Sequence, residues 1–584
     1  FAFTVDTTAP TGVIKAVSSE GGQETWNDLQ ESFAFGLISK ERITLTGEFT
    51  DQTCASLAAV EYYRAEAGQG DDAIVPLSRE ELDQVREWTA FDRLEITSDE
   101  QAVYYVRITD LAGNSAYIST DGLMVDRLVP RIYGRVVSDI AAEPGALADG
   151  RFVYGGDVQV SVYASDFASA GVSSGLRTVS YRILNMGIET QAGILYEAGD
   201  GETAAGKPAA EWSGGFTVDS GLNNSNDVQL LICAQDNAGN LHEEAISIGI
   251  DITAPAVEVS YDNNEAAVGF YFNRARRATI VVTERNFRPE NVGLAITSSA
   301  ETAPDISSWT RTEEAGNPDD IRWTAEVYYS ADGDYTFDIR VVDLAGNVSE
   351  GVNYGGSTAP AQFTVDQTAP LISVSYNNND VRNDRYFAGP RTARIVVVER
   401  NFDPAQVDFV QTASREGEDM ELPAISWTSD GDVHTARIDY RADGDYTLDV
   451  RAVDLAGNTS GETDYGDSAA AQAFTIDQTA PQLSVDGLRN GGAYSGEVIP
   501  VISFSDIHYD SCEICLLRTR LGEKNEDVTE TFMPDIEEFS WGGRGEYDTF
   551  DRIADNDGIY RLTVRAVDLA GNEEAETLSF TLNR

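Results

Sequence analysis

Two short motifs recur along this chain, five times each and at nearly constant spacing. Asp-x-Ala-Gly-Asn begins at Asp110, Asp236, Asp343, Asp454 and Asp568. Asp-x-Thr-Ala-Pro begins at Asp6, Asp251, Asp366 and Asp477, with a degenerate copy at Asp126. These aspartates are 120, 125, 115 and 111 residues apart. A period close to the length of one small domain indicates a tandem array. Such arrays span distance and present surfaces more often than they catalyse reactions.

The composition restricts the partners that the chain can have. Its 584 residues suggest several domains, and a hydrophobic content of 42% is enough for packed cores. A net charge of −57 argues against nucleic acid as a ligand and favours divalent cations and a soluble monomer. Four cysteines are too few for a disulfide framework. No run of 18 apolar residues is present, so we expect no membrane insertion.

The fourth repeat shows the predicted strands most clearly. Residues 371–376 and 446–453 alternate between apolar and polar side chains, as half-buried strands do. Residues 393–398, 433–440 and 473–476 are predicted as further strands, with Asp-Gly and Asn-Asn turns between them. About seven strands in about 110 residues, without a long amphipathic helix, predict an antiparallel sandwich of immunoglobulin type. Tyr335, Tyr446 and Tyr560 stand where such a sandwich has its tyrosine corner.

The sequence therefore predicts an all-β fold of five tandem immunoglobulin-like β-sandwich domains in an elongated array. The domain limits given by the motifs are residues 7–126, 127–251, 252–366, 367–477 and 478–584. Residues 1–6 match the strand that closes each repeat. We expect them to be the last strand of a preceding repeat, and the chain to be a fragment of a longer array.

These motifs resemble those of the bacterial immunoglobulin-like (Big-type) repeats of large cell-surface adhesins and of the stalks of secreted enzymes. The resemblance covers nearly the whole chain. It implies an extracellular, non-catalytic module at the bacterial cell surface that serves as a spacer or a binder. It also implies calcium at the domain junctions. The second junction, Arg127-Leu128-Val129, departs from the motif of the family.

Sandwich topology independently brings acidic residues together at each junction. The loop before the last strand and the loop after the second strand both lie at the pole where the chain enters the domain. The predicted metal-ligating triplets are Asp6, Asp51 and Asp110; Asp126, Asp166 and Asp236; Asp251, Glu284 and Asp343; Asp366, Glu399 and Asp454; and Asp477, Asp506 and Asp568. Three adjacent carboxylates repel one another unless a cation or protons bind. Hard oxygen ligands suit Ca²⁺, so Ca²⁺ is the predicted cofactor.

A purely structural interpretation of the same residues stays open. The aspartate of Asp-x-Ala-Gly-Asn can accept hydrogen bonds from the backbone of its own turn, where glycine and asparagine tolerate positive φ. The proline of the linker motif can simply stiffen the linker.

The sequence shows little sign of catalytic chemistry, and we predict that the chain is not an enzyme. His242, His434 and His508 lie in no metalloprotease motif and are interpreted as surface or packing residues. Cys512 and Cys515 fall in a predicted strand, where residues three apart face opposite sides, so they are interpreted as structural thiols. Trp309 and Trp427 occupy equivalent places and indicate packing. Trp26, Trp88, Trp212 and Trp541 have no equivalents and are where a ligand surface would be sought.

Two functions are compatible with these observations. The first is an extended adhesin stalk that binds a host glycoprotein, glycan or immunoglobulin. The alternative is a set of non-catalytic spacer modules of a large secreted enzyme that degrades glycans or proteins. Three irregular regions favour binding: the insertion at residues 78–93, which has a helical composition, the loops around Trp212, and the acidic stretch at residues 523–555. The identity of the ligand-binding residues is unknown.

Overall fold

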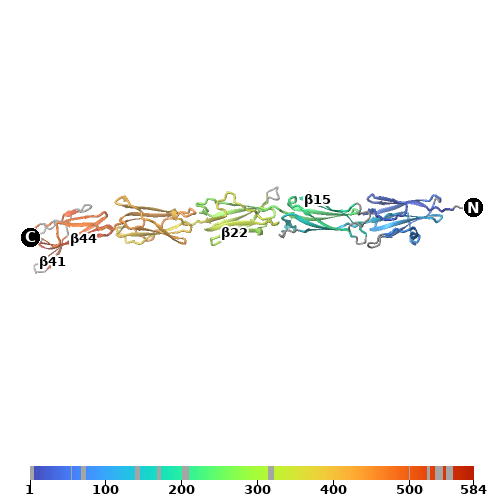
Figure 1. The fold of residues 1–584 in the computed structure, drawn as a ribbon. Helices are drawn as coiled ribbons and strands as arrows, with labels where there is room; N and C mark the ends of the chain where they lie inside the picture. The colour runs from blue at the N-terminus through green and yellow to red at the C-terminus, as the bar shows by residue number, and fades with distance from the viewer. Residues whose placement is uncertain are drawn as a thin grey trace.

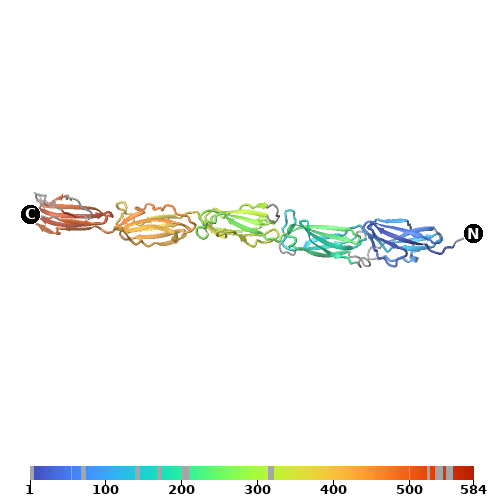
Figure 2. The same ribbon diagram turned by 90° about the horizontal axis from the view of Figure 1, so that it is seen from above.

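The chain forms an elongated row of β-sandwiches with its two termini at opposite ends (Figures 1 and 2). This is a computed structural model, which describes residues 5–53, 56–66, 74–137, 145–167, 172–199, 210–313, 321–496, 498, 500–521, 527–532, 544–546 and 557–583. Residues 1–4, most of the predicted strand of a preceding repeat, lie outside that range. Cys54, Trp541 and most of residues 523–555 also lie outside the described residues.

Within the described residues the strands form ten sheets, which pair in chain order, and each pair is called a unit below. The first unit contains β1 (Thr11–Ser18), β2 (Gln23–Trp26), β3 (Leu37–Ser39), β4 (Ile43–Thr50), β5 (Leu57–Glu66), α1 (Arg79–Leu82), β6 (Thr89–Ala90), β7 (Arg93–Ile96), β8 (Glu100–Asp110), β9 (Ser115–Ser119) and β10 (Leu123–Val125). The second contains β11 (Arg131–Val137), β12 (Val153–Tyr154), β13 (Val158–Ser165), β14 (Leu176–Asn185), β15 (Ile188–Glu197), β16 (Glu211–Val218), β17 (Ser225–Asp236) and β18 (Leu241–Ile250).

The third unit contains β19 (Ala256–Tyr261), β20 (Tyr271–Phe272), β21 (Arg276–Thr283), the 3-10 turn η1 (Pro289–Asn291), β22 (Val292–Ser298), β23 (Thr310–Glu313), β24 (Ile321–Tyr329), β25 (Gly333–Val341), β26 (Val352–Asn353) and β27 (Gln362–Val365). The fourth contains β28 (Leu371–Tyr376), β29 (Tyr386–Phe387), β30 (Arg391–Val398), η2 (Pro404–Gln406), β31 (Val407–Arg415), β32 (Glu418–Asp419), β33 (Ser426–Asp430), β34 (Val433–Tyr440), β35 (Gly444–Ala452) and β36 (Ala473–Ile476).

The fifth unit contains β37 (Gln482–Asp486), β38 (Gly492–Tyr494), β39 (Val501–Ser505), β40 (Tyr509–Leu521), β41 (Asp527–Phe532), β42 (Arg544–Glu546), β43 (Gly558–Asp568) and β44 (Glu573–Leu582). The predicted all-β, immunoglobulin-like fold class is confirmed. The domain limits given by the motifs stay a prediction.

The fourth unit shows how alternating side chains build such a sandwich. One sheet has the strand order β28-β30-β34-β33 and the other β29-β36-β35-β31-β32. β28 runs antiparallel to β30, with Ile372 opposite Val397 and Val374 opposite Ile395. Alternate residues of β28 and β35 are buried, so the apolar half of each strand faces the core between the sheets. All five strands predicted in this repeat are present.

A charged side chain lies inside the cores of the third and fourth units, which the sequence analysis did not predict. The guanidinium of Arg276 lies 3.9 Å from the ring centroid of Tyr261 and 4.1 Å from that of Phe272. Arg391 repeats the arrangement at 3.7 Å from Tyr376. Burial lowers the pKa of each arginine to about 10. Arg276 donates to backbone carbonyls, including that of Ala359 at 3.1 Å, so aromatic faces and carbonyl dipoles hold this charge.

The predicted tyrosine corners are present where their hydrogen bonds can be followed. Tyr335 Oη donates to the carbonyl of Ala331 at 2.8 Å, and Tyr446 Oη to that of Ala442 at 2.9 Å. Tyr560 is fully buried and stacks on Phe580. These contacts hold the start of β25, β35 and β43 in the third, fourth and fifth units.

The tryptophans described by the structure all pack within the units. Trp26 is a core residue of the first unit, and Trp309 and Trp427 pack against the cores of the third and fourth. Trp88 lies under the guanidinium of Arg107, 4.4 Å away, and Trp212 packs against the core of the second unit. Trp323 also packs against the core of the third unit, so a packing role accounts for every described tryptophan.

The insertion and the cysteine pair have simple structures. The predicted helical character at residues 78–93 amounts to one turn, α1, capped by Ser78 and Glu81 in a reciprocal capping box. Cys512 and Cys515 both lie on β40, as predicted, and both are free thiols, a state that the sequence had left open between unpaired and mutually bonded.

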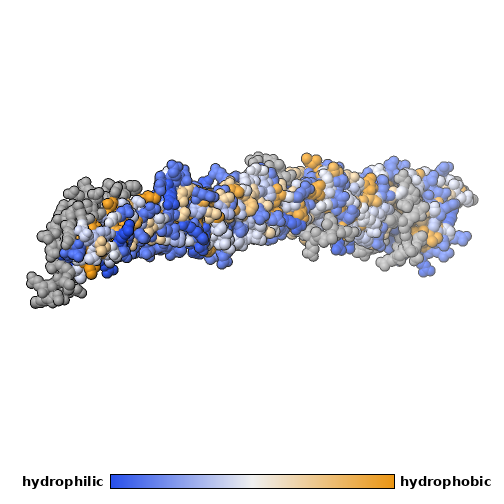
Figure 3. All heavy atoms as spheres, turned by 60° about the vertical axis from the view of Figure 1, so that its left-hand side comes forward, coloured by the Kyte–Doolittle hydropathy of each residue, from blue (hydrophilic) through white to orange (hydrophobic). Residues whose placement is uncertain are grey.

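The described surface has no continuous apolar belt on the face shown in Figure 3, where hydrophobic residues alternate with hydrophilic ones. Among the described residues, no helix has the length and apolar character needed to cross a membrane.

Candidate metal centres at the unit junctions

Each junction places acidic residues at the ends of three chain segments that converge. The first is the linker aspartate, which at Asp126, Asp251, Asp366 and Asp477 directly follows β10, β18, β27 and β36, the last strands of the preceding units. The second directly follows β4, β13, β21, β30 or β39, at Asp51, Asp166, Glu284, Glu399 and Asp506. The third is the aspartate of the Asp-x-Ala-Gly-Asn turn, at or just after the end of β8, β17, β25, β35 or β43.

Four of the five predicted triplets come together as predicted. In each, ligand atoms of the three residues all lie within 4.8 Å of one another: Asp6, Asp51 and Asp110; Asp126, Asp166 and Asp236; Asp251, Glu284 and Asp343; and Asp366, Glu399 and Asp454. The last three sets are fully buried. In the fifth unit the same criterion groups Asp477, Asp506 and His508. Asp568, the third residue predicted here, lies beside this group, because Asn572 Nδ2 donates both to Asp568 Oδ2 at 2.8 Å and to the carbonyl of Asp477 at 2.7 Å.

The Asp-x-Ala-Gly-Asn turn ties its aspartate to the linker, so its structural role is also real. In the third unit, Asn347 donates from its backbone N–H to Asp343 Oδ1 at 2.8 Å and from Nδ2 to Asp343 Oδ2 at 2.7 Å. The same Nδ2 donates to the carbonyl of Asp251 at 2.8 Å. Gly346 takes a φ of 91°, which the turn requires and other residues resist. All five turns repeat these bonds, from Asn114 to Asn572.

Burial and mutual repulsion raise the pKa of several of these carboxyl groups. Burial, followed by the charges of Asp251 and Asp343, raises the pKa of Glu284 to about 8. The pKa of Glu399 rises to about 7 and that of Asp236 to about 7, again mainly through burial. Without a cation, these clusters therefore hold protons near neutral pH. A bound cation would remove the repulsion and allow the carboxylates to ionise.

The third cluster contains a cation of its own. Arg285 Nη2 lies 3.0 Å from Asp251 Oδ1, with side-chain exposures of 8% and 0%. The same guanidinium donates to the carbonyl of Ile250 at 2.9 Å and contacts Asn224 of the second unit. Sequence analysis missed Arg285, because its role depends on the neighbouring unit.

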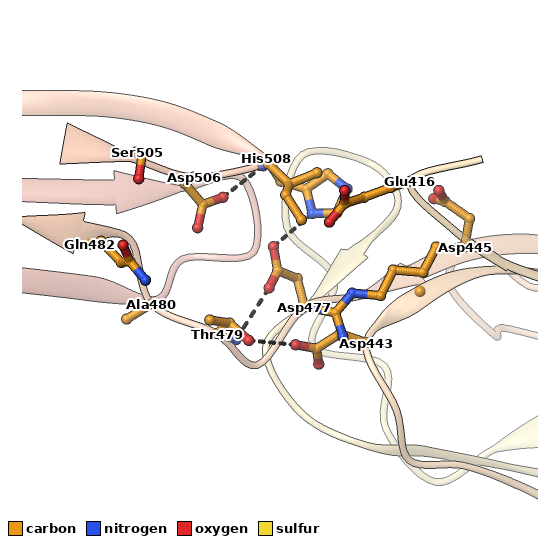
Figure 4. Close-up of a pocket in the computed structure, with 13 residues that line it drawn as sticks. Glu416, Asp443, Asp445, Asp477, Thr479, Ala480, Gln482, Ser505, Asp506 and His508 are labelled. Carbon is orange, nitrogen blue, oxygen red and sulfur yellow. Dashed lines mark hydrogen bonds and ion pairs between the residues drawn. The ribbon is translucent and has the colours of Figure 1, made fainter. Parts of the chain in front are cut away.

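The fifth cluster contains an imidazole that sequence analysis assigned to surface or packing. His508 Nδ1 donates to Asp477 Oδ2 at 2.7 Å, and the backbone N–H of His508 donates to Asp506 Oδ1 at 2.6 Å (Figure 4). The packing assignment holds for His434, which stacks on Phe402 and contacts the carbonyl of Glu399. It also fits His242, which contacts the carbonyl of Pro130.

The donor sets fit a hard divalent cation. Carboxylate oxygens converge from three segments, and Ca²⁺ takes six to eight oxygens from carboxylates, carbonyls and water in flexible geometry. In the first unit, Asp6 Oδ2 is buried within the cluster region and has no hydrogen-bond partner, as a metal ligand lacking its ion would. The fourth cluster also fits a divalent cation. In the third cluster, Arg285 already neutralises part of the negative charge.

Comparison with known proteins finds a family match for one segment of the third unit. Residues 305–353 match the family described as bacterial Ig-like domain. The match confirms the resemblance first indicated by the two motifs, and it includes the turn at Asp343. No curated protein sequence matches the chain.

Several solved structures are similar in part. One is a tetra-tandem repeat from the extending region of a large adhesion protein, at 17% identity over 74% of this chain and 96% of that one, with a TM-score of 0.32. Another is the Escherichia coli adhesin FdeC, at 14% identity, 56% and 97% coverage and a TM-score of 0.22. A third is the protocadherin GammaB4 extracellular domain, at 10% identity, 97% and 87% coverage and a TM-score of 0.24.

Proposed function

We propose that this chain is the extended, non-catalytic stalk of a bacterial cell-surface or secreted adhesin, whose junctions are stiffened by calcium. The observation that carries the proposal is the repetition of one arrangement at every junction. A linker aspartate, two acidic loop ends and an asparagine that binds the linker backbone recur five times. Interactions repeated at every junction restrict bending between units, and an extended stalk needs this restriction.

Calcium would act at these joints by neutralising carboxylates from two successive units. The linker aspartate belongs to the end of one unit and the other two ligands to the next, so an ion bound by all three resists bending between the units. The second cluster is included, because Asp126, Asp166 and Asp236 converge despite the degenerate linker motif. Binding only to the folded state would also stabilise each unit by mass action.

The proposed location is outside the cell, with a host glycoprotein, glycan or immunoglobulin as partner of the whole protein. The strong negative charge supports a neutral or basic partner whose association slows as salt is added. The alternative is a set of spacer modules in a secreted enzyme that degrades glycans or proteins. A binding assay against immobilised host glycoproteins and glycans distinguishes the adhesin from the spacer, because a spacer would bind none of them.

Small-angle X-ray scattering tests the calcium-stiffened stalk. Units about 40 Å long would give a maximum dimension of roughly 200 Å. We expect this dimension to be sharply defined in Ca²⁺ and to broaden in chelator, with a lower melting temperature. The double variant Glu284→Gln, Asp343→Asn should abolish the calcium response of the third unit.

The matched control changes two exposed acids of the same unit, Glu258→Gln and Asp338→Asn, which alter the net charge equally. This control should respond to calcium like the natural chain. Identical scattering and melting in excess Ca²⁺ and in chelator would refute calcium stiffening, and a compact particle would refute the stalk itself.

A further inference from the structure

The junction between the fourth and fifth units combines a cavity with an imidazole in its cluster. A cavity of about 380 Å³ opens there, lined by Asp443 and Asp445 of the fourth unit, the linker residue Asp477, and Asp506 and His508 of the fifth. Figure 4 shows the imidazole of His508 directed at the carboxylate of Asp477. The cluster of Asp477, Asp506 and His508 therefore adjoins a cavity large enough for water.

His508 occupies the place that asparagine holds in the third and fourth units. The backbone N–H groups of Asn286 and Asn401 donate to Glu284 Oε1 and Glu399 Oε1, each at 2.6 Å. The backbone N–H of His508 donates to Asp506 at the same distance. The side chains also correspond, because Asn286 Nδ2 donates to Asp251 Oδ2 at 2.6 Å and Asn401 Nδ2 donates to Asp366 Oδ2. His508 Nδ1 makes the same bond to Asp477 Oδ2.

This replacement changes what the position can offer a metal. The amide nitrogen of asparagine is only a donor, so Asn286 and Asn401 can orient the linker carboxylate but cannot ligate through that atom. An imidazole nitrogen that has lost its proton is a strong ligand for Zn²⁺ and similar ions, whereas Ca²⁺ takes oxygen almost exclusively. The atoms that could ligate lie within 4.8 Å of one another, close enough to share one ion after small side-chain movements.

We propose that Asp477, Asp506 and His508 form a junction site for a transition-metal ion of the Zn²⁺ class. This deepens the proposed function, because it rests on the same junction clusters but assigns one of them a different ion. The ion replaces the proton that now joins Nδ1 to Asp477 Oδ2. Two carboxylates and one imidazole supply three ligands, and water from the adjoining cavity completes a four-coordinate shell. The order of affinity among divalent ions at such N,O ligands favours Zn²⁺ over lighter ions such as Mn²⁺.

The test is Zn²⁺ retention by the full chain. The protein is dialysed with Zn²⁺ in the presence of a large excess of Ca²⁺, which occupies the all-oxygen clusters, and bound Zn²⁺ is then counted by elemental analysis. We expect one Zn²⁺ per chain. His508→Asn, which installs the residue of the third and fourth units, should weaken Zn²⁺ binding at least tenfold, since even loss of an outer partner of a ligand costs about 10–100-fold. His508→Gln is the second variant, in case the first fails to fold.

The reverse substitution tests whether a histidine at this position is enough to create a Zn²⁺ site. Asn401→His should add a second retained Zn²⁺ at the fourth unit. His242→Asn should change nothing, because its imidazole contacts the carbonyl of Pro130 and belongs to none of the clusters. Zn²⁺ retained equally by His508→Asn and His508→Gln would overturn the proposal. No Zn²⁺ in the natural chain, with calcium stiffening intact, would overturn it while leaving the proposed function standing. Absence of both Zn²⁺ and Ca²⁺ binding would defeat the two together.

Discussion

The third and fourth units share the sequence Glu-Arg-Asn-Phe directly after β21 and β30, yet the arginine acts differently in each. In the third unit Arg285 turns into the carboxylate cluster and forms a buried ion pair with Asp251. In the fourth unit Arg400 reaches back to Asp334 of the preceding unit, 3.3 Å away, where the side chains are 35% and 63% exposed. One motif therefore yields an internally compensated cluster in one unit and an uncompensated cluster in the next.

The difference originates in the preceding unit. Arg285 is held by the carbonyl of Ile250 and by Asn224, both from the second unit. Arg400 instead meets an acidic residue, Asp334, at the start of β25. The charge of a junction thus depends on residues about 60 positions earlier in the chain, which explains how nearly identical repeats can differ as metal sites.

Replacing each arginine by alanine should reveal the largest difference between the two units, in their stability. In chelator, Arg285→Ala leaves Asp251 buried without its ion-pair partner and should destabilise the third unit by about 3–5 kcal/mol. Arg400→Ala removes an exposed pair and should cost the fourth unit less than about 1 kcal/mol. Hydrogen exchange of peptides from β25 and β35 measures the two units separately. Equal losses of protection would show that burial of the pair does not matter.

The two units should also differ in how pH affects them when no metal is present. The pKa of Glu284 is about 8 in the folded state, above its ordinary value of 4.5, so folding binds a proton. Its contribution to stability is complete below about pH 4.5 and is lost as pH rises through 8. The pKa of Glu399 is about 7, so its contribution to the stability of the fourth unit is lost as pH rises through 7. Hydrogen exchange in chelator should show protection of the third unit falling over the wider range.

Two controls follow for the pH experiment. Glu284→Gln should flatten the profile of the third unit without changing the fourth. Added Ca²⁺ should restore protection at high pH in both, because it binds the ionised carboxylates. A profile that rises with pH in chelator would contradict the proton uptake.

The two clusters should also differ in their affinity for Ca²⁺. The third cluster, whose charge Arg285 partly neutralises, should bind the ion more weakly. Arg285 repels an entering cation, so the fourth cluster should bind Ca²⁺ more tightly than the third. Arg285→Ala should strengthen binding at the third by roughly tenfold, a modest share of the repulsion between charges a few ångströms apart. The midpoint of a Ca²⁺ titration, followed by protection of β25 and β35, gives each affinity. An unchanged midpoint would place the ion away from Arg285.

The sequence predicted the fold class and the convergence of carboxylates because both follow from local and periodic information. Alternation in residues 371–376 marks a strand, and the order of loops in a sandwich places Asp366, Glu399 and Asp454 at one pole. Neither inference needs the relative orientation of units. Whether Ca²⁺ occupies any cluster stays a prediction.

What the sequence analysis missed depends on contacts between units or on exact correspondence between divergent repeats. Arg285 could not be assigned, because Arg400 has the same neighbours in sequence and a different partner in space. His508 could have been found by aligning Asp506-Ile507-His508 with Glu284-Arg285-Asn286. The divergence of the fifth repeat hid that alignment, and the backbone hydrogen bond from His508 to Asp506 makes it visible.

The smallest predicted effect concerns the feature that the two units share. Asn347 and Asn458 each donate one side-chain hydrogen bond to the turn aspartate and another to the linker carbonyl, at 2.7–2.8 Å. Asn347→Ala and Asn458→Ala should each cost about 1 kcal/mol, the net worth of one or two such bonds. The two costs should be equal, in contrast to those at Arg285 and Arg400. Hydrogen exchange in β25 and β35 tests this, and a clear inequality would mean that the surrounding cluster, and not the turn, determines the strength of the joint.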